Sequence, residues 1–400
     1  MKIALSPDLH CFYSTYDRLD DAGNSIRREE WKKSVKTMLQ FCKKNKVDTI
    51  IFPGDYFVNP KPTAEAVLLV SELFKAFEKS GINVVGIAGN HDIAGVGKKN
   101  MNDVVSAIGA NAKWCSSSFG TTVIEDVGFA FLPFVKSPEL TAYSPDYANM
   151  EMAEQLIHVA GDMKATLDKT RKVKKTILVG HWSIQGAVTS SGQSMAYSAS
   201  GVETVLPLSE LVAQKWDACL FGHIHKPQVL SESAPFVAYS GCIQRINIGE
   251  CNDKRGFYIY DTETDAHEFL SIPAMEMVSF SKEIASSADF DALLDEIKST
   301  KIAGKIAYVK YTVSKESFGY VNKRELIKTL DAGNPVCIAG IVPKVVEEGR
   351  QRDSSLTETL DNESALAKWL ATKQQVSDDD KAKVMALFKR YSDELVEEAV

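Results

Sequence analysis

Short apolar runs alternate with helical patterns along the first part of the chain. The runs KIALSPDLH (2–10), VDTIIFPGD (47–55) and INVVGIAGNHD (82–92) each place consecutive apolar residues before a polar end, which is typical of buried strands. Between them, apolar residues recur at helical spacing over 28–46 and 63–79, which predicts amphipathic helices. The order strand, helix, strand, helix, strand predicts a parallel sheet with crossover helices.

The same kind of pattern continues to residue 264 and then weakens. It predicts a helix over 149–170 and further strands at 129–134, 174–182, 217–225, 235–241 and 256–264. A smaller α/β unit follows, with helices expected over 288–299 and 322–332 and strands over 305–313 and 335–342. We therefore divide the chain into a main α/β domain (1–272), a small α/β domain (273–346), a polar linker (347–362) and a helical pair (363–400).

Composition and charge restrict the classes of protein to which the chain can belong. Of the 400 residues, 44% are apolar and 25% are charged, as in globular proteins, and no apolar run is long enough for a membrane span. The N-terminus lacks the long apolar region of a signal peptide. Seven dispersed cysteines without a CxxC pair argue against a disulfide framework and for the cytoplasm. The net charge of −7 does not indicate a general polyanion binder, but the acidic segment 347–400 leaves the rest of the chain close to neutral.

Polar motifs follow the carboxyl ends of five predicted strands, where open α/β sheets bind ligands. In chain order they are Asp8-x-His10, Gly54-Asp55, Gly89-Asn90-His91-Asp92, Gly180-His181 and Gly222-His223-x-His225. A single Gly-Asp or Gly-His pair at a strand end is usually a turn or a cap, but five such motifs together predict a metal centre. Glycine precedes four of them and lets the backbone turn tightly. We predict that the isolated His158 lies on a helix surface and His267 in a loop.

The chemistry of these side chains indicates which metals they would bind. Carboxylates, imidazoles and an amide carbonyl suit Mn²⁺, Fe²⁺ or Zn²⁺, and they give little reason to expect Ca²⁺ or an iron–sulfur cluster. One carboxylate can also bridge two ions about 4 Å apart, as in many phosphoesterases. The pattern therefore favours a two-metal site.

In this order, DxH, GD, GNHD, GH and GHxH resemble the motifs of the calcineurin-like metallophosphoesterases, which include protein phosphatases, cyclic-nucleotide phosphodiesterases, nucleotidases and DNA nucleases. The segments VGHWSIQGA (179–187), GHIHKPQ (222–228) and YSGCIQRINIGE (239–250) resemble more specifically the SbcD-type nuclease subunit and its archaeal, eukaryotic and phage relatives. The resemblance covers about residues 1–262. Two departures are the long segment CFYSTYDRLDDAGNSIRR (11–28), either a substrate loop or an insertion, and Ile93, where a small polar residue is expected.

The resemblance implies a fold and a set of roles. The fold is α/β: a metallophosphoesterase sandwich of mixed β-sheets flanked by helices, followed by the small α/β capping domain and the C-terminal helical pair. Two divalent ions are implied, Mn²⁺ first, with Mg²⁺, Fe²⁺ or Zn²⁺ as alternatives. The resemblance implies that one ion is held by Asp8, His10 and His225 and the other by Asn90, His181 and His223, with Asp55 as the bridge between them. It also implies that His91 is the general acid and that Asp92 orients His91.

We expect a two-metal DNA nuclease, exonuclease or endonuclease, that acts in DNA repair and recombination. The alternative within enzymes is a small-molecule phosphodiesterase or nucleotidase of the same fold, and a third reading is a non-catalytic scaffold. The residues appended after the core favour the nuclease, because a small substrate needs no added domain. The complete ligand set and His91 disfavour the scaffold. Expected DNA contacts are Tyr13, Arg18, Lys98 and Arg245, with the small domain as a further DNA-contacting surface.

The resemblance also implies partners. They are DNA, an SbcC-like ATPase subunit bound through residues 363–400, and a second copy of the chain. Binding to a membrane is not expected. Apolar residues at helical spacing in 378–398 support a docking helix. The alternative is that both terminal helices pack back on the small domain.

Overall fold

The computed structural model describes residues 1–93, 113–115, 118–191, 193, 203–346, 362–371, 373 and 377–397. It separates into two compact units, Met1–Thr312 with Gly319–Lys344 and Val313–Phe318 with Val345–Val400. Lys98 and nearly all of the expected linker fall outside the described residues.

The first of two six-stranded sheets carries the three strands predicted from the N-terminal pattern. Its order is β14 (His267–Ser271), β13 (Gly256–Asp261), β1 (Lys2–Leu5), β2 (Thr49–Phe52), β3 (Asn83–Ile87) and β4 (Lys113–Cys115). Strands β1 to β4 run parallel, whereas β13 pairs antiparallel with β1 and with β14. The parallel core of the sheet confirms the prediction.

The second sheet is also mixed. Its order is β11 (Gln228–Ser231), β12 (Phe236–Tyr239), β10 (Ala218–Gly222), β7 (Lys175–His181), β6 (Val127–Leu132) and β5 (Gly120–Ile124). The four middle strands are parallel, and β11 and β5 pair antiparallel at the two edges. A parallel two-stranded pair, β8 (Ser183–Ile184) and β9 (Val205–Leu206), lies beyond β7 in sequence.

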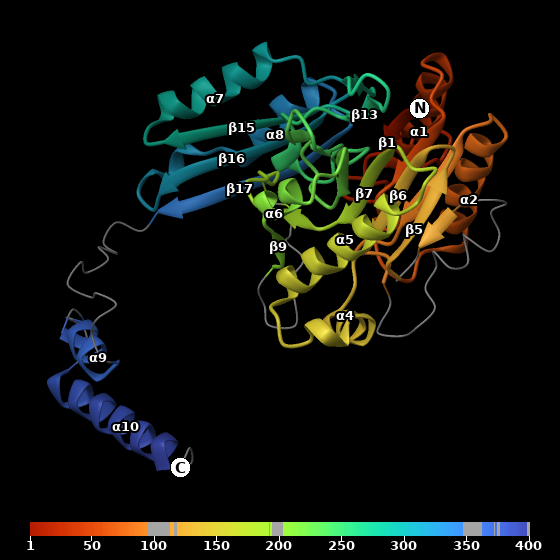
Figure 1. Ribbon diagram of the computed structural model, residues 1–400. Helices are drawn as coiled ribbons and strands as arrows, with labels where there is room; N and C mark the ends of the chain where they lie inside the picture. The colour runs from red at the N-terminus through yellow and green to blue at the C-terminus, as the bar shows by residue number, and fades with distance from the viewer. Residues whose placement is uncertain are drawn as a thin grey trace. The chain divides into compact units, whose positions relative to one another are not determined.

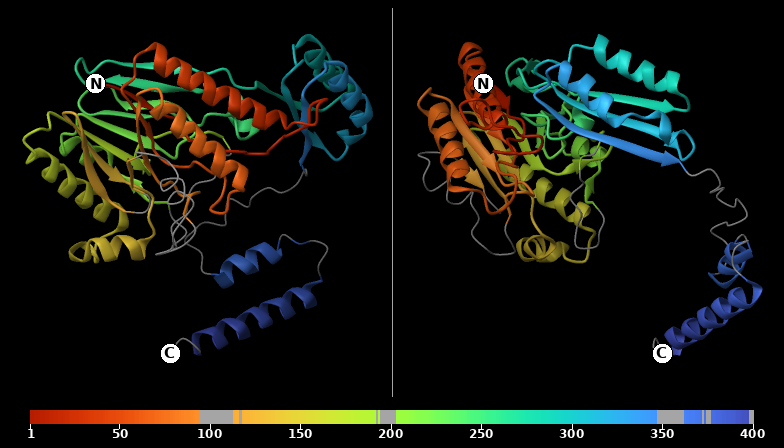
Figure 2. Two further views of the ribbon diagram at one scale, coloured as in Figure 1. Left: turned by 90° about the vertical axis from the view of Figure 1, so that its right-hand side faces the viewer. Right: turned by 180° about the vertical axis from the view of Figure 1, so that it is seen from behind.

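Alternating side chains divide the described interior of the two-sheet sandwich into three hydrophobic clusters. On β1, Ile3 and Leu5 join the core between the sheets, while Ala4 faces the helices α1 (Ile26–Lys44) and α2 (Ala64–Glu78). The outer face of the second sheet is covered by α5 (Met152–Asp168) and α6 (Leu208–Ala213). Figures 1 and 2 show α1 and α2 on one side of the paired sheets and α5 on the other. The predicted sandwich flanked by helices is confirmed.

The small α/β domain is built on a three-stranded sheet. Its elements are β15 (Met277–Ile284), α7 (Ser287–Ser299), β16 (Ile306–Ser314), η3 (Ser317–Tyr320), α8 (Lys323–Ala332) and β17 (Cys337–Val346), with the strand order β15, β16, β17. The sequence pattern missed β15 because its buried residues, Met277, Phe280 and Ile284, are three and four positions apart and do not show the alternation typical of a strand with one solvent-facing side.

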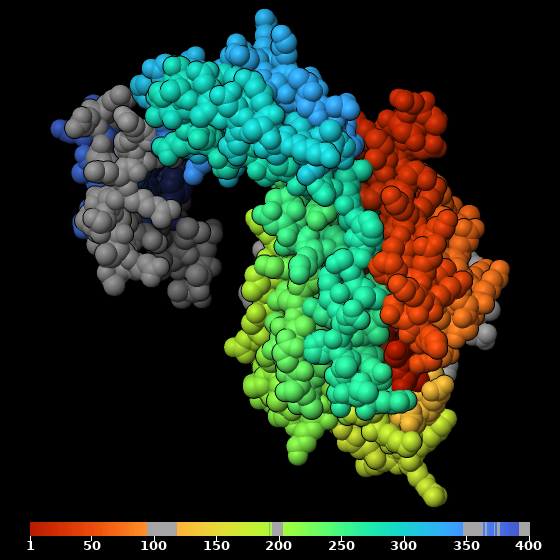
Figure 3. Space-filling view, turned by 90° about the horizontal axis from the view of Figure 1, so that it is seen from above, coloured from red at the N-terminus to blue at the C-terminus, as the bar shows by residue number. Residues whose placement is uncertain are grey.

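The long segment between β1 and α1 joins the main domain to this small domain. Tyr16 packs with Met277 and Ile306, and the Cys337 thiol donates a hydrogen bond to the carbonyl oxygen of Tyr16 at 3.4 Å. In Figure 3 the cyan and blue atoms of the small domain adjoin the red N-terminal segment. Since the same segment contains Asp8 and His10, it connects the predicted metal site with the small domain.

Short elements complete the main domain. They are α4 (Ser137–Tyr143), η1 (Pro145–Tyr147) and η2 (Ile248–Glu250). His158 is exposed on α5, as predicted. The loop prediction for His267 is wrong: the residue lies in β14 and its ring stacks on Phe236, with 4.1 Å between ring centroids. The strand was missed because HEFLS is short and mixes charged with apolar residues.

The C-terminal unit contains the two helices that the sequence predicts, α9 (Asn362–Ala371) and α10 (Asp378–Glu397), which contact each other. Large apolar side chains stay exposed on both, namely Trp369, Val384, Leu387 and Tyr391 at 48, 40, 47 and 53%. Among the helices in the described part of the chain, none has the length and apolar character needed to cross a membrane.

Trp31 links the helical layer to the loop that follows β1. Its side chain is 1% exposed, and its indole N–H donates to the carbonyl oxygen of Leu9 at 2.9 Å, between the predicted ligands Asp8 and His10. Trp31→Ala should lower the free energy of unfolding by about 3–5 kcal/mol, because it leaves a large cavity and an unpaired carbonyl. Leu68→Ala on α2 is the control, since Leu68 is 57% exposed. Urea denaturation that gave equal stabilities for the two variants would contradict this account of the core.

Candidate metal centre

The predicted ligands meet where the two sheets end. Asp8 and His10 follow β1, Asp55 follows β2, and Asn90 follows β3 in the first sheet. From the second sheet, His181 ends β7, while His223 and His225 follow β10. All seven are buried except Asn90, which is half-buried. The carboxyl ends of parallel strands from both sheets therefore supply one buried cluster of oxygen and nitrogen donors.

One group of donors is formed by Asp8, His10 and His225, whose ligand atoms all lie within 4.8 Å of one another. The Nε2 atoms of His10 and His225 are 3.2 Å apart. Asp8 Oδ1 is buried and has no hydrogen-bond partner among the described residues. A buried carboxylate oxygen without a partner is costly, and a cation would satisfy it, so these three residues fit a divalent metal.

A second group is formed by Asn90, His181 and His223. The Asn90 Oδ1 atom lies 3.1 Å from His181 Nε2 and 3.1 Å from His223 Nδ1. The other ring nitrogen of His181 faces the carbonyl oxygen of Pro53 at 2.6 Å. Because a carbonyl only accepts, that Nδ1 atom carries a proton, which leaves Nε2 as the nitrogen available to a metal.

Asp55 lies between the two groups. Its Oδ2 atom is 3.6 Å from His10 Nε2 and 3.3 Å from His181 Nε2, so one oxygen faces a histidine of each group. Its Oδ1 atom accepts the backbone N–H of His91 at 2.9 Å, which fixes the carboxylate plane. This arrangement allows Asp55 to bridge two cations.

Burial and proximity perturb the titration of the cluster. Burial raises the pKa of Asp8 well above its ordinary value and lowers the pKa of His10 well below. For Asp55, burial acts to raise the pKa, but the surrounding imidazoles, His181 foremost, hold it well below its ordinary value. For His181, burial acts to lower the pKa, but Asp55 raises it to about 9. Without cations the cluster therefore keeps protons that bound metals would displace.

The backbone is strained at three of the ligands. His10, Asp55 and His223 adopt positive φ angles of 38°, 52° and 93°, in the region that residues other than glycine rarely occupy. A side chain on Gly89 would place its Cβ 2.2 Å from Asp55 Oδ1, so the glycine permits the close approach of the two loops. The strain at these positions agrees with a functional site.

The last two residues of the Gly-Asn-His-Asp motif make different kinds of contact. The ring of His91 is held through Nδ1 by the carbonyl oxygen of Val58 at 2.8 Å. The carboxylate of Asp92 accepts the backbone N–H groups of Asp55, Tyr56, Phe57 and Gly89 at 2.8–3.3 Å. Val58 thus contacts the His91 ring, and Asp92 ties together the loops after β2 and β3; the implied role of Asp92 in orienting His91 stays a prediction.

Residues that the sequence did not single out hold the last two histidines. His225 Nδ1 is 3.0 Å from the buried carboxylate of Glu250, which also pairs with Arg255 at 2.5 Å. Gln193 clamps the same turn, because its amide donates to the carbonyl oxygen of His223 at 2.6 Å and accepts the N–H of His225 at 3.0 Å. Gln193 lies in no recognisable motif, and Glu250 ends the segment 239–250 without a role assigned from the sequence, so only the fold reveals these contacts.

The expected DNA contacts lie in different surroundings. Tyr13 lines a cavity of about 90 Å³ over the metal ligands, with its ring centroid 6.4 Å from that of His10. Arg18 is exposed. The guanidinium of Arg245 donates to the carbonyl oxygens of Met275 at 2.9 Å and Asp253 at 3.0 Å, so it is engaged within the protein.

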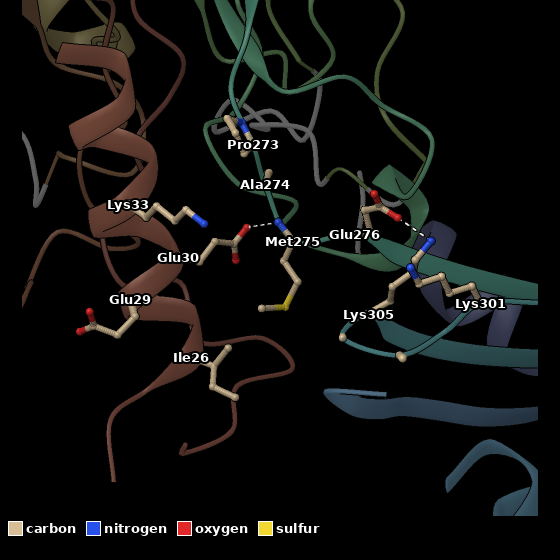
Figure 4. Close-up of a pocket in the computed structure, with 12 residues that line it drawn as sticks. Ile26, Glu29, Glu30, Lys33, Pro273, Ala274, Met275, Glu276, Lys301 and Lys305 are labelled. Carbon is tan, nitrogen blue, oxygen red and sulfur yellow. Dashed lines mark hydrogen bonds and ion pairs between the residues drawn. The ribbon is translucent and has the colours of Figure 1, made fainter. Parts of the chain in front are cut away.

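Another pocket, of about 730 Å³, lies between α1 and the start of the small domain (Figure 4). Glu30 accepts the backbone N–H of Met275 at 2.7 Å, and Glu276 pairs with Lys305 at 2.5 Å. No histidine or cysteine is found among the described residues that line it. It therefore lacks the donor set of the metal centre.

Residues 1–227 match the calcineurin-like phosphoesterase family, so the chain belongs to that family. Among curated proteins it is similar to the SbcD component of the nuclease SbcCD from Staphylococcus epidermidis, with 25% identity over 59% of this chain and 61% of that protein. It is also similar to exonuclease subunit 1 of Enterobacteria phage T4, with 26% identity over 60% of this chain and 62% of the phage protein.

A third relative is the DNA double-strand break repair protein Mre11 of Archaeoglobus fulgidus, which is 23% identical over 63% of this chain and 52% of that protein. The matches thus span between about half and three fifths of the length of these three relatives. They confirm the family that the sequence motifs indicated.

Asp55 should determine metal binding at both positions. Asp55→Asn removes the charge of the shared carboxylate and should weaken Mn²⁺ binding at both by more than the roughly 10–100-fold that the loss of an outer partner of a ligand costs. The circular dichroism spectrum should not change, because the strand ends keep their backbone hydrogen bonds. Asp48→Asn is the control, since the Asp48 side chain is exposed and accepts the N–H of Lys2 at 2.7 Å, away from the cluster. If calorimetry finds Mn²⁺ bound to Asp55→Asn as tightly as to the wild type, Asp55 is not shared.

Proposed function

We propose that the protein is a two-metal nuclease that hydrolyses phosphodiester bonds of DNA. The observation that carries the proposal is the position of Asp55, whose Oδ2 atom faces one histidine of each ligand group. In this proposal one cation is held by Asp8, His10 and His225, and the other by the group that contains Asn90. Bound divalent cations would neutralise the anionic phosphodiester and activate water. We propose Mn²⁺ as the metal, because the mixed oxygen and nitrogen donors suit it.

His91 is proposed as the general acid. Its Nδ1 atom faces the carbonyl oxygen of Val58 at 2.8 Å and therefore carries a proton; in the doubly protonated imidazolium, Nε2 also carries one and is the nitrogen that would give it to the leaving oxygen. The ring lies at the cavity over the ligands, 4.9 Å between centroids from the ring of His10. His91 thus lies where a substrate phosphate would bind; its ligand atom also lies within 4.8 Å of those of His10 and Asp55, so its role as acid rather than ligand is part of the proposal.

The size of the cavity supports a polymeric substrate. Its volume of about 90 Å³ equals that of about three water molecules, enough for a phosphate group. The remainder of the substrate would lie outside, beside Tyr13 and Asn247, which line the cavity. The names of the relatives, a nuclease subunit, an exonuclease subunit and a double-strand break repair protein, support DNA as that substrate and repair as the process.

The direct test is cleavage by purified protein with Mn²⁺ of a labelled DNA duplex, a labelled single strand and bis-p-nitrophenyl phosphate. DNA should be cut, and His91→Asn should slow the cleavage by roughly 10²–10⁴-fold while both metals stay bound. His158→Asn is the control, because His158 is an exposed histidine on α5. Hydrolysis of bis-p-nitrophenyl phosphate without cleavage of DNA would instead indicate a small-molecule phosphodiesterase. Loss of a metal from His91→Asn would make His91 a ligand.

We further propose that α9 and α10 bind an SbcC-like ATPase subunit. The support is the exposed apolar surface of the pair, which includes Trp369, Leu387 and Tyr391, because exposed apolar patches mark binding sites for other proteins. The three acidic residues 378–380 at the start of α10 favour a stable helix, since they lie at the positive end of its dipole.

Deletion of residues 363–400 should abolish co-purification with the ATPase subunit and leave Mn²⁺-dependent cleavage of short DNA intact. Leu387→Asp should have the same effect, because it places a charge in the apolar surface, whereas the exposed Lys389→Asp tests for an effect of charge alone. Unchanged affinity of the truncated chain for the ATPase would show that the tail is not the docking element.

A further inference from the structure

The two histidines of the Gly-His-Ile-His turn face the metal cluster with different ring nitrogens. His223 directs Nδ1 at Asn90 Oδ1, 3.1 Å away, whereas His225 directs Nε2 at His10 Nε2, 3.2 Å away. In each ring the remaining nitrogen contacts a carboxylate, Glu203 for His223 and Glu250 for His225, both at 3.0 Å. A separate carboxylate therefore selects the metal-facing nitrogen of each ring.

For His223 this choice has a chemical consequence. A carboxylate accepts hydrogen bonds, so the Nε2 atom that faces Glu203 carries the proton and Nδ1 keeps its lone pair. That lone pair points at the acceptor oxygen of Asn90, and two acceptors at 3.1 Å repel each other unless a cation lies near both. Glu203 thus prepares His223 to bind a cation beside Asn90 rather than to hydrogen-bond to it.

Glu203 is itself held in place. Ser183 donates a hydrogen bond to the carboxylate of Glu203, and the Glu203 side chain is 10% exposed. Ser183 pairs with Val205 in the two-stranded sheet of β8 and β9, and it lies just beyond the predicted ligand His181. The chain segment that brings His181 to the cluster therefore also anchors the carboxylate that contacts His223.

The main chain of His223 is fixed by hydrogen bonds, so the contact with Glu203 determines the orientation of the ring. The His223 N–H donates to Asp8 Oδ2 at 2.9 Å, its carbonyl oxygen accepts from Gln193 at 2.6 Å, and its φ angle is 93°. With the main chain fixed on both sides, the remaining freedom is rotation of the ring. A ring flip would exchange Nδ1 and Nε2 and turn an N–H toward Asn90, which would exclude a cation.

We propose that Glu203 is a positioning residue that sets the tautomer and orientation of His223, and thereby the affinity of the metal position formed by Asn90, His181 and His223. The proposal rests on the two-metal function proposed above. The proposal distinguishes the two metal positions, because Glu203 would change the metal affinity of one position, whereas Glu250 contacts a histidine of the other. Partners of this kind typically change metal affinity by 10–100-fold.

The test is calorimetric titration of Mn²⁺ into wild-type protein, Glu203→Gln and Glu232→Gln. Glu232 is the matched control, since it pairs with a histidine, His267, at 2.9 Å in β14, a strand that carries no predicted ligand. In Glu203→Gln, one of two Mn²⁺ equivalents should bind about 10–100-fold more weakly and the other as in the wild type. DNA cleavage should then need more Mn²⁺ and recover when it is supplied, whereas Glu232→Gln should match the wild type.

Two bound Mn²⁺ with unchanged affinities in Glu203→Gln would overturn the role of Glu203 alone, while a wild-type chain that binds no Mn²⁺ would overturn the two-metal function as well.

A second measurement needs no variant. Long-range ¹H–¹⁵N correlation spectra of the wild-type protein loaded with Zn²⁺ should show the ring proton of His223 on Nε2. A proton on Nδ1 would overturn the proposal even if Glu203→Gln failed to fold.

Discussion

The carboxylate of Asp55 is the interaction on which the site depends. Its Oδ2 atom lies 3.6 Å from a histidine that follows a strand of the first sheet and 3.3 Å from a histidine that ends a strand of the second. The sandwich thus brings two halves of a ligand set together at one oxygen. So much buried charge is unfavourable without cations: burial raises the pKa of Asp8 and lowers the pKa of His10, which in each case favours the neutral form.

Much of the backbone around Asp55 serves to hold that oxygen in place. Asp92 gathers four backbone N–H groups from the loops after β2 and β3, and Trp31 supports the loop after β1 from the helical layer. The strained φ angles at His10 and His223 persist because hydrogen bonds fix the chain on either side. The same contacts therefore stabilise the fold and fix the geometry of the site.

The local features of this structure could be predicted from the sequence alone. Apolar runs with polar ends predicted the parallel strands, and the five strand-end motifs predicted which side chains would converge, but only the structure shows that these strands belong to two sheets. It could not identify Glu203, Gln193 or Glu250, since each reaches its histidine only through the fold. It also could not show that the carboxylate of Asp92 accepts four backbone N–H groups, because a neighbouring His-Asp pair in sequence does not reveal the contacts of the carboxylate.

Anomalous diffraction at the manganese edge, from crystals of the full chain grown with Mn²⁺, tests the central claim most directly. We predict two peaks, one among Asp8, His10 and His225 and one among Asn90, His181 and His223, each beside the carboxylate of Asp55. A single peak, or two peaks that do not share Asp55, would contradict the claim.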